Sequence, residues 1–197
     1  MPTNPYQALH KAIRHRLFAV GSQLGWTDFA DANAVEELRR QFAGLCMFLE
    51  HHGEEEDSKI HPVLARLGPE LLESMQEQHE EIDAELTELK AAFGQTTPDT
   101  AHAYYLRFLR FAAAYVLHTD DEERRVWPVL SALATPEELA TMNDEDYGKS
   151  SPEGLGMMLG RVFPVLNPPE RAEILGEIEA QVPPAFYAKV LENAGEQ

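Results

Sequence analysis

Apolar residues recur every three or four positions in four long segments that fill the first two thirds of the chain. This spacing puts them on one face of an α-helix, so each segment predicts an amphipathic helix. The segments start at Asn4, near Asn33, at Gly68-Pro69 and at Thr97-Pro98. Their apolar stripes are Leu9, Ile13, Leu17, Val20 and Leu24; Phe42, Leu45 and Leu49; Leu72, Met75, Ile82, Leu86 and Phe93; and Phe111, Ala114, Tyr115 and Val129. We therefore expect an all-α protein built from two helical hairpins.

The composition changes after Thr135-Pro136, because seven prolines fall between Pro136 and Pro184. We therefore divide the chain into a domain of residues 1–135 and a helical, proline-rich C-terminal extension of residues 136–197. No histidine follows His118, so the extension is expected to serve packing or oligomerisation, including homodimer formation, rather than chemistry. Its short helices are expected near 137–146, 152–163, 169–181 and 185–193.

One stretch of sequence occurs twice. Residues 51–64 (HHGEEEDSKIHPVL) and 117–130 (LHTDDEERRVWPVL) align without a gap at an offset of 66 (118 − 52). The alignment places His52 on His118, Glu56 on Glu122 and the proline of each stretch on the other. Residues four apart on a helix share one face, about one turn apart, so each His/Glu pair is able to bind a metal ion. The proline is expected to bend or end each helix just beyond the pair.

The helices that precede these pairs also match. Residues 8–17 and 77–86 share the pattern H-x2-I-x3-L at an offset of 69 (79 − 10). Each predicted hairpin thus supplies one histidine from its first helix and a His/Glu pair from its second. Six inward-facing donors at one level predict a dinuclear metal site with two bridging glutamates. The expected ligands are His10, His52, Glu56, His79, His118 and Glu122.

Two simpler explanations account for less of this pattern. Histidines can hydrogen-bond inside a helical core, but buried carboxylates without a cation cost on the order of several kcal/mol each. A haem held by two histidines would leave both glutamates unexplained. Imidazole and carboxylate donors in a helical bundle favour iron or manganese, with zinc as a further option.

The charge and cysteine content exclude several other classes. With 34 acidic and 16 basic side chains, the formal net charge is −18, which repels nucleic acid and anionic membranes. The single cysteine, Cys46, excludes an internal disulfide and an iron–sulfur cluster held by four thiolates. The first residues lack the pattern of a signal peptide, and no apolar run has the length of a membrane span. We expect a cytoplasmic protein.

The motifs resemble those of a known family. The order H-x2-I-R, H-x3-E-D-x4-P, a lone histidine, and H-x3-E-E-x4-P is similar to the bacterial hemerythrin-like HHE cation-binding proteins, over about residues 5–133. The resemblance implies an up-down-up-down four-helix bundle around two non-haem iron ions with carboxylate and oxo or hydroxo bridges. By this resemblance His10 and His52 would hold one iron, His79 and His118 the other, and Glu56 and Glu122 would bridge.

Two positions depart from the oxygen-carrying hemerythrins. Those carriers have a second histidine four residues after the one on the third helix, and here that position is Asp83, which is either a ligand or an acid at the mouth of the bundle. Their fourth helix uses a carboxylate five residues after its histidine, which would select Glu123. The internal repeat and the four-residue spacing favour Glu122 instead.

Other residues near the site have less certain roles. Tyr115 lies one turn before His118 and is either a core aromatic or a redox or hydrogen-bonding partner. Lys59 and Arg125 share one repeat position; they face the metal site, pair outward with acids such as Asp57 and Asp121, or extend into solvent. The remaining histidines are expected at the surface: His15, His51, His61 and His102.

Two classes of function follow from these expectations. One is a di-iron oxidoreductase that acts on oxygen, nitric oxide or hydrogen peroxide, with iron as electron source and Lewis acid. The other is a binding module without turnover: an oxygen or iron sensor, carrier or store. An anionic ligand at Asp83 would stabilise ferric iron and favour the first class.

Overall fold

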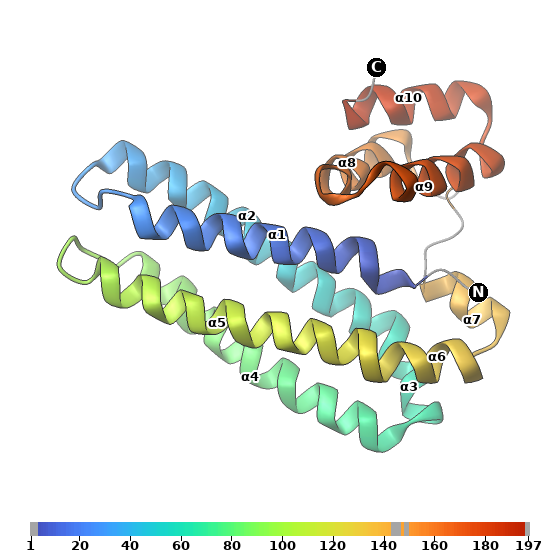
Figure 1. Ribbon diagram of the computed structural model, residues 1–197, viewed down its shortest axis with the longest axis horizontal. Helices are drawn as coiled ribbons and strands as arrows, with labels where there is room; N and C mark the ends of the chain where they lie inside the picture. Colours follow the sequence, from blue (N-terminus) through green and yellow to red (C-terminus); the bar gives the residue numbers. More distant parts are fainter. Residues whose placement is uncertain (1–3, 143–146, 148–149, 196–197) are drawn as a thin grey trace. The chain divides into compact units, whose positions relative to one another are not determined.

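The computed structural model of the protein describes residues 4–142, 147 and 150–195. Within these residues every regular element is helical, as the sequence predicted (Figure 1). None of the described helices combines the length and the apolar character needed to cross a membrane. The four long helices are α1 (Pro5–Trp26), α2 (Ala32–Glu55), α4 (Pro69–Phe93) and α5 (Ala101–Asp121).

The chain forms two compact units: residues 13–134, and residues 1–12 together with 135–197. The division falls inside α1, which nevertheless continues as one helix from Pro5 to Trp26. The predicted domains of residues 1–135 and 136–197 stay a prediction, because compact packing alone does not show which part folds independently.

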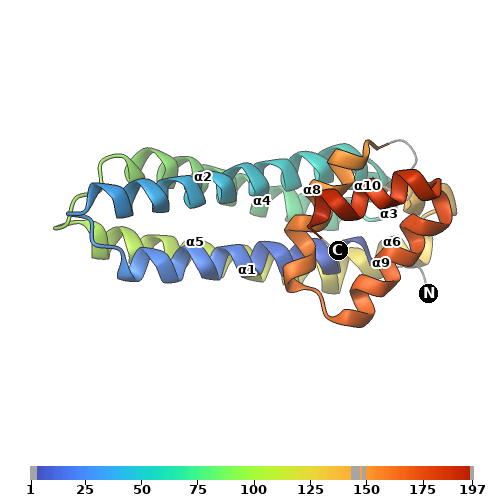
Figure 2. The same cartoon turned by 90° about the horizontal axis from the view of Figure 1, so that it is seen from above.

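In the unit of residues 13–134, the long helices lie side by side, and the α1–α2 and α4–α5 connections are at the same end (Figures 1 and 2). An aromatic cluster fills the core near that end. Phe42 stacks on Phe93 with ring centroids 5.2 Å apart, and Phe108 meets Phe42 edge-on at 6.2 Å. The hydroxyl of Tyr104 donates to the Leu89 carbonyl at 3.1 Å, so its polar atom is satisfied inside the core.

The observed helix ends correct one prediction. The helix expected from Thr97-Pro98 begins only at Ala101, because Thr97 to Thr100 form a turn in which the Thr97 amide donates to Thr100 Oγ1 at 2.9 Å. The end of α4 at Phe93, before Gly94, agrees with the sequence. Asp31 caps α2 by accepting from the amides of residues 33 and 34.

The chain stays helical through each repeated proline, but the long α-helix before it gives way to a turn of different pitch. Each proline follows a π-helical turn, η1 (Glu56–Ile60) or η2 (Glu122–Val126), after which the chain continues as α3 (His61–Leu67) or α6 (Trp127–Leu133). Proline lacks an amide donor and its ring collides with the carbonyl four residues earlier. The π turn takes in one extra residue, with amides donating to the carbonyl five residues back, and so accommodates the ring.

The second unit contains the helices of the proline-rich extension. Most start with proline in the first turn, where its missing amide costs nothing and its backbone angle suits a helix. Asn167 and Glu170 add a capping box, and Glu170 also pairs with Lys11 of the same unit. Residues 143–146 of the helix expected at 137–146 lie outside the described residues. The observed helices are α7 (Pro136–Met142), α8 (Pro152–Val162), η4 (Phe163–Val165, 3-10), α9 (Pro168–Gln181) and α10 (Pro184–Ala194).

The α8–α10 contact depends on one glycine. A Cβ atom at Gly156 would lie 2.3 Å from Asn193 Cβ and 3.1 Å from Asn193 Cα. Because those atoms belong to the backbone of α10 or lie next to it, the two helices would have to move apart. Gly160, one turn further along α8, has no atom within 4 Å of such a Cβ.

This difference gives a matched test of the extension. Gly156→Ala should destabilise the packing of α8 on α10 by about 1–3 kcal/mol, because overpacking outweighs the gain in helix propensity. Gly160→Ala should be neutral or stabilising by up to about 1 kcal/mol. Urea unfolding followed by circular dichroism measures both free energies. Equal effects of the two substitutions would contradict the close approach of the helices.

Candidate metal centre

The two repeated His/Glu pairs are brought together from α2 and α5. His52 Nε2 lies 3.5 Å from Glu56 Oε1, and His118 Nε2 lies 3.2 Å from Glu122 Oε1. All four side chains are only 3% exposed. In each pair the histidine lies in the last turn of the α-helix and the glutamate begins the π turn, so the four-residue spacing predicted from the sequence places both groups on one inner face.

His79 of α4 joins the two glutamates. Its Nε2 atom is 3.5 Å from Glu56 Oε2 and 3.8 Å from Glu122 Oε1. The ring of His79 also meets that of His118 edge-on, with centroids 4.7 Å apart. Glu56, His79, His118 and Glu122 thus form a group whose candidate ligand atoms lie within 4.8 Å of one another.

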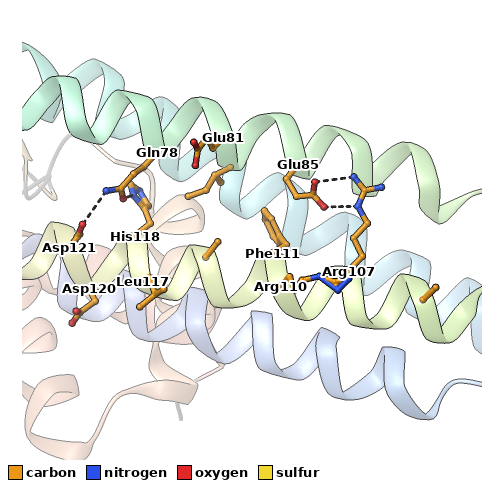
Figure 3. A pocket seen from close by; sticks show the side chains of 13 residues that line it. Gln78, Glu81, Glu85, Arg107, Arg110, Phe111, Leu117, His118, Asp120 and Asp121 are labelled. Carbon is orange, nitrogen blue, oxygen red and sulfur yellow. Dashed lines mark hydrogen bonds and ion pairs between the residues drawn. The ribbon is translucent and has the colours of Figure 1, made fainter.

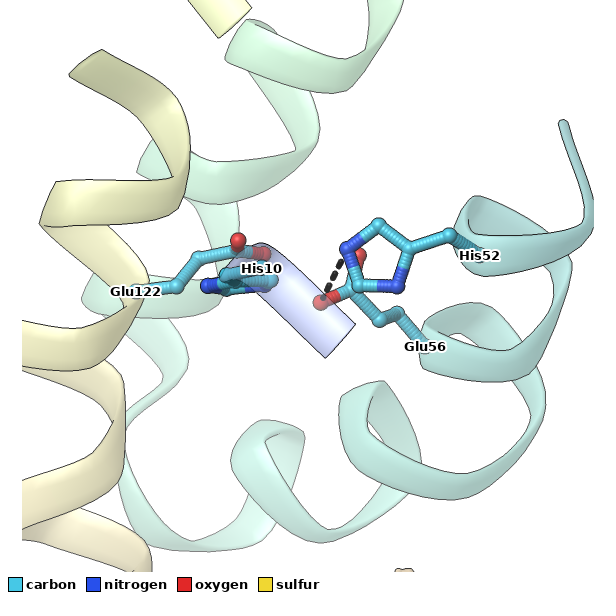
Figure 4. A group of neighbouring side chains, drawn as sticks. All are labelled: His10, His52, Glu56 and Glu122. Atoms are coloured by element: carbon cyan, nitrogen blue, oxygen red, sulfur yellow. Dashed lines mark ion pairs between the residues drawn. The ribbon is translucent and has the colours of Figure 1, made fainter. Parts of the chain in front are cut away.

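His10 of α1 belongs to a second such group. This group consists of His10, His52, Glu56 and Glu122, again with candidate ligand atoms within 4.8 Å of one another, and Figure 4 shows the four side chains converging. Both groups contain the same two glutamates. A cation in either group would therefore have both carboxylates within reach, and a bridged pair of cations stays a prediction.

The electrostatics of the glutamates fit a bound cation. Burial raises the pKa of Glu56 well above its ordinary value, and the neighbouring charge of Glu122 raises that pKa further. Neither carboxylate oxygen of Glu56 accepts a hydrogen bond among the described residues. Two ionised carboxylates buried side by side are costly, and a cation would offset that cost and keep both groups ionised. The donor set of imidazole nitrogens and carboxylate oxygens suits iron.

Comparison with known protein families agrees with this geometry. The model of the hemerythrin HHE cation binding domain matches residues 2–130. The chain belongs to this family. Comparisons with curated proteins and with solved structures give no match. Family membership and the His/Glu groups together make the chain a metal-binding protein with a site that is typical of iron. Coordination by the six individual residues stays a prediction.

A chain of polar contacts orients His118 in the HHE domain. Gln78 Oε1 lies 2.9 Å from His118 Nδ1, and the Gln78 amide donates to Asp121 Oδ2 at 3.1 Å (Figure 3). Because the Gln78 oxygen accepts, the tautomer that forms this hydrogen bond carries its proton on Nδ1 and presents Nε2 to Glu122. The sequence analysis did not identify Gln78. Its only signal was its position directly before His79.

Each of the two repeated cations, Lys59 and Arg125, pairs with an acid four residues before it. Lys59 donates to Glu55 Oε1 at 2.8 Å and Arg125 donates to Asp121 Oδ2 at 3.0 Å. Each cation thus makes one of the acid contacts that the sequence left open, and a role of either cation beside the metal site stays a prediction. Arg125 also supports the Gln78–His118 chain through Asp121, because both side chains bind the same carboxylate oxygen.

The remaining candidates lie beside the groups rather than within them. Glu123 pairs with Arg14 at 2.8 Å, whereas Glu122 is a member of both groups. Asp83 is exposed and belongs to no group among the described residues. Tyr115 is buried with its ring edge-on to His118, the placement of a core aromatic, and burial followed by the charge of Glu56 raises its pKa.

One histidine was placed wrongly by the sequence analysis. His61 is 7% exposed rather than at the surface, whereas His15, His51 and His102 are exposed as expected. In an uninterrupted α-helix His61 would point about 180° from His52. The extra residue taken up by the π turn changes this angle to about 80°, which brings the ring inward. No propensity rule predicts a π turn at this position, so the change in direction could not be read from the sequence.

A groove between α4 and α5 reaches the centre from one side. It has a volume of about 1000 Å³, and His118 forms part of its wall together with apolar Ile82 and Phe111 (Figure 3). Away from His118 the wall includes a bidentate ion pair in which Arg107 donates to Glu85 at 2.6 and 3.0 Å. A small molecule in this groove would contact the edge of His118.

The raised pKa of Glu56 predicts how the metal-free HHE domain responds to pH. The folded form retains a proton that the unfolded form releases above the ordinary glutamate value of 4.5. Stability from this group is therefore fully present below that pH and is lost as the pH rises towards the folded-state value. Metal-free protein should be less stable at about pH 8 than at about pH 5, and Glu56→Gln should reduce the difference.

Urea unfolding of metal-free protein at both pH values measures the effect. Glu54→Gln is the control, because it removes an exposed carboxylate from the same helix. The same pH dependence in wild type and Glu56→Gln would show that Glu56 is ionised without metal, contrary to the expectation.

Proposed function

We propose that the HHE domain holds two non-haem iron ions bridged by Glu56 and Glu122 and reacts with a small molecule: oxygen, nitric oxide or hydrogen peroxide. His10 and His52 would bind one ion, and His79 and His118 the other. The observation that carries this proposal is the pair of buried glutamates shared by two groups of histidines. Manganese or zinc would be accepted by the same donor types but is less favoured.

The helix arrangement supports the proposal. An up-down-up-down course of α1, α2, α4 and α5 would direct one histidine from the first helix and a His/Glu pair from the second helix of each hairpin to the same level. The side-by-side helices in Figures 1 and 2 are compatible with this course. Each hairpin then contributes half of the centre, as the sequence repeat predicts.

The protein side chains would control what the metal does. Bound iron would supply a redox-active Lewis acid. The glutamates provide negative charge that favours the oxidised state, and Gln78 fixes the orientation of His118. Buried apolar side chains one helical turn from the candidate histidines, including Ile13 and Leu49, would restrict water at the inner side of the centre.

A binding module without turnover is the second candidate. The expectation of an anionic ligand at Asp83 favoured an enzyme, but Asp83 is exposed and outside both groups of described residues. That argument for turnover loses its support. An oxygen or iron sensor, carrier or store would use the same buried donors.

The visible spectrum of reduced, iron-loaded protein distinguishes the two candidates. Conversion on air exposure to an oxidised form, with consumption of added peroxide or nitric oxide over many cycles, supports the enzyme. An absorption band that appears in air and disappears under vacuum supports the binding module.

Metal stoichiometry tests the centre itself. Protein loaded with ferrous iron under anaerobic conditions should retain about two ions per chain, as a dinuclear bundle site requires. Glu56→Ala and Glu122→Ala should each lose iron, whereas His15→Ala should retain both ions because His15 is exposed. Elemental analysis measures the content. A plateau at one ion or none in wild type would rule out the dinuclear centre.

Metal removal should also lower stability. Without cations, two carboxylates and several imidazoles share a small interior. A metal that binds only the folded state stabilises it by about 3–4 kcal/mol at 100–1,000 times its dissociation constant. Thermal unfolding of metal-free and loaded protein at one pH measures this. Equal melting temperatures would contradict metal binding at the buried donors.

A further inference from the structure

A second cleft in the HHE domain lies between α2 and α4 and is strongly acidic. Its volume is about 480 Å³. Five carboxylate side chains line it, with no lysine or arginine among the lining residues, and His79 is the one histidine in its wall. The lining carboxylates are Glu50, Glu54, Asp57, Glu80 and Asp83.

The inner end of this cleft touches the buried donors. His79 is 14% exposed, and its Nε2 atom lies 3.5 Å from Glu56 Oε2. That oxygen is buried and accepts no hydrogen bond among the described residues. The acidic cleft therefore leads, through the His79 imidazole, to a buried carboxylate in the interior.

A third group of metal-binding side chains stands at the boundary between the cleft and the interior. Asp57, His61 and His79 have candidate ligand atoms within 4.8 Å of one another. Asp57 is 68% exposed, whereas His61 is buried beside it, with Nδ1 2.8 Å from Asp57 Oδ1. The ring centroids of His61 and His79 are 5.1 Å apart. Two imidazoles and one carboxylate with open positions are a common donor set for ferrous iron.

The second repeat lacks this boundary group. The position of Asp57 corresponds to Glu123, whose carboxylate pairs with Arg14, and the position of His61 corresponds to Trp127. Neither residue lines the acidic cleft. The two halves of the centre are thus alike in their buried donors and different in their connection to solvent.

We propose that divalent cations enter the centre through the acidic cleft and bind transiently to Asp57, His61 and His79 before His79 and Glu56 take them inward. This inference rests on the proposed metal centre. The carboxylates of the cleft concentrate cations at its mouth, and the transient group replaces water ligands step by step. His79 belongs both to the entry group and to the inner group, so a cation passes inward by exchanging Asp57 and His61 for Glu56 and His118.

The rate of metal loading tests the route. Metal-free protein is mixed with Co²⁺ in a stopped-flow spectrometer, and the d–d absorption of protein-bound cobalt reports loading. His61→Gln should slow loading about tenfold, while the final cobalt content stays at the wild-type value. A tenfold change lies within the range by which charged clefts and preformed sites alter association rates. Glu54→Gln/Glu80→Gln should slow loading by a similar factor at low salt and by less at high salt, because salt screens exposed charges.

Asp120→Asn/Glu123→Gln is the matched control. It removes two carboxylates at the repeat positions of Glu54 and Asp57, outside the acidic cleft and, for Asp120, in the α4–α5 groove. Wild-type loading in this control, with slow loading in the cleft variants, supports the route. Slow loading only in the control, or unchanged rates in every variant, would overturn it. Absence of cobalt binding by wild type would instead refute the proposed metal centre.

Discussion

The site depends on two carboxylates held close together where water does not reach them. Glu56 and Glu122 are each almost fully buried, and burial and mutual repulsion both raise the pKa of Glu56. A folded chain tolerates such a pair only with protons or with a cation between them. The surrounding histidines can remain neutral while they bind a metal. The centre is therefore arranged for cation binding, and its electrostatic cost is present whenever the cation is absent.

Much of this arrangement could be predicted because the sequence repeats itself. The spacing of His52 to Glu56 and of His118 to Glu122 survives in the structure, since four residues span about one helical turn. The apolar stripes predicted the long helices, and Gly94 marked the end of α4 correctly. The start of α5 was predicted too early, because Thr97 and Thr100 stabilise a turn that a proline also suits.

The contacts around the centre could not be predicted from spacing alone. Gln78 reaches His118 across forty positions of sequence, and Arg14 reaches Glu123 from another helix. The expected position of His61 was wrong because a regular helix up to Pro62 would turn it outward, whereas the chain forms a π turn before that proline. Periodicity assigns a face correctly only while the number of residues per turn stays constant.

The π turns also divide each ligand-bearing helix into two lengths with separate registers. In a regular helix Leu64 would point about 120° from His52, and the extra residue reduces this to about 20°. Leu64 and its repeat partner Leu130 are both 0% exposed, and α3 and α6 pack on each other. Each of these helices thus presents its candidate metal donors and, beyond the π turn, a buried leucine in the same direction. Without the π turn, an α-helix continued through residues 56–60 would leave His52 in place and turn Leu64 about 100° away from that direction.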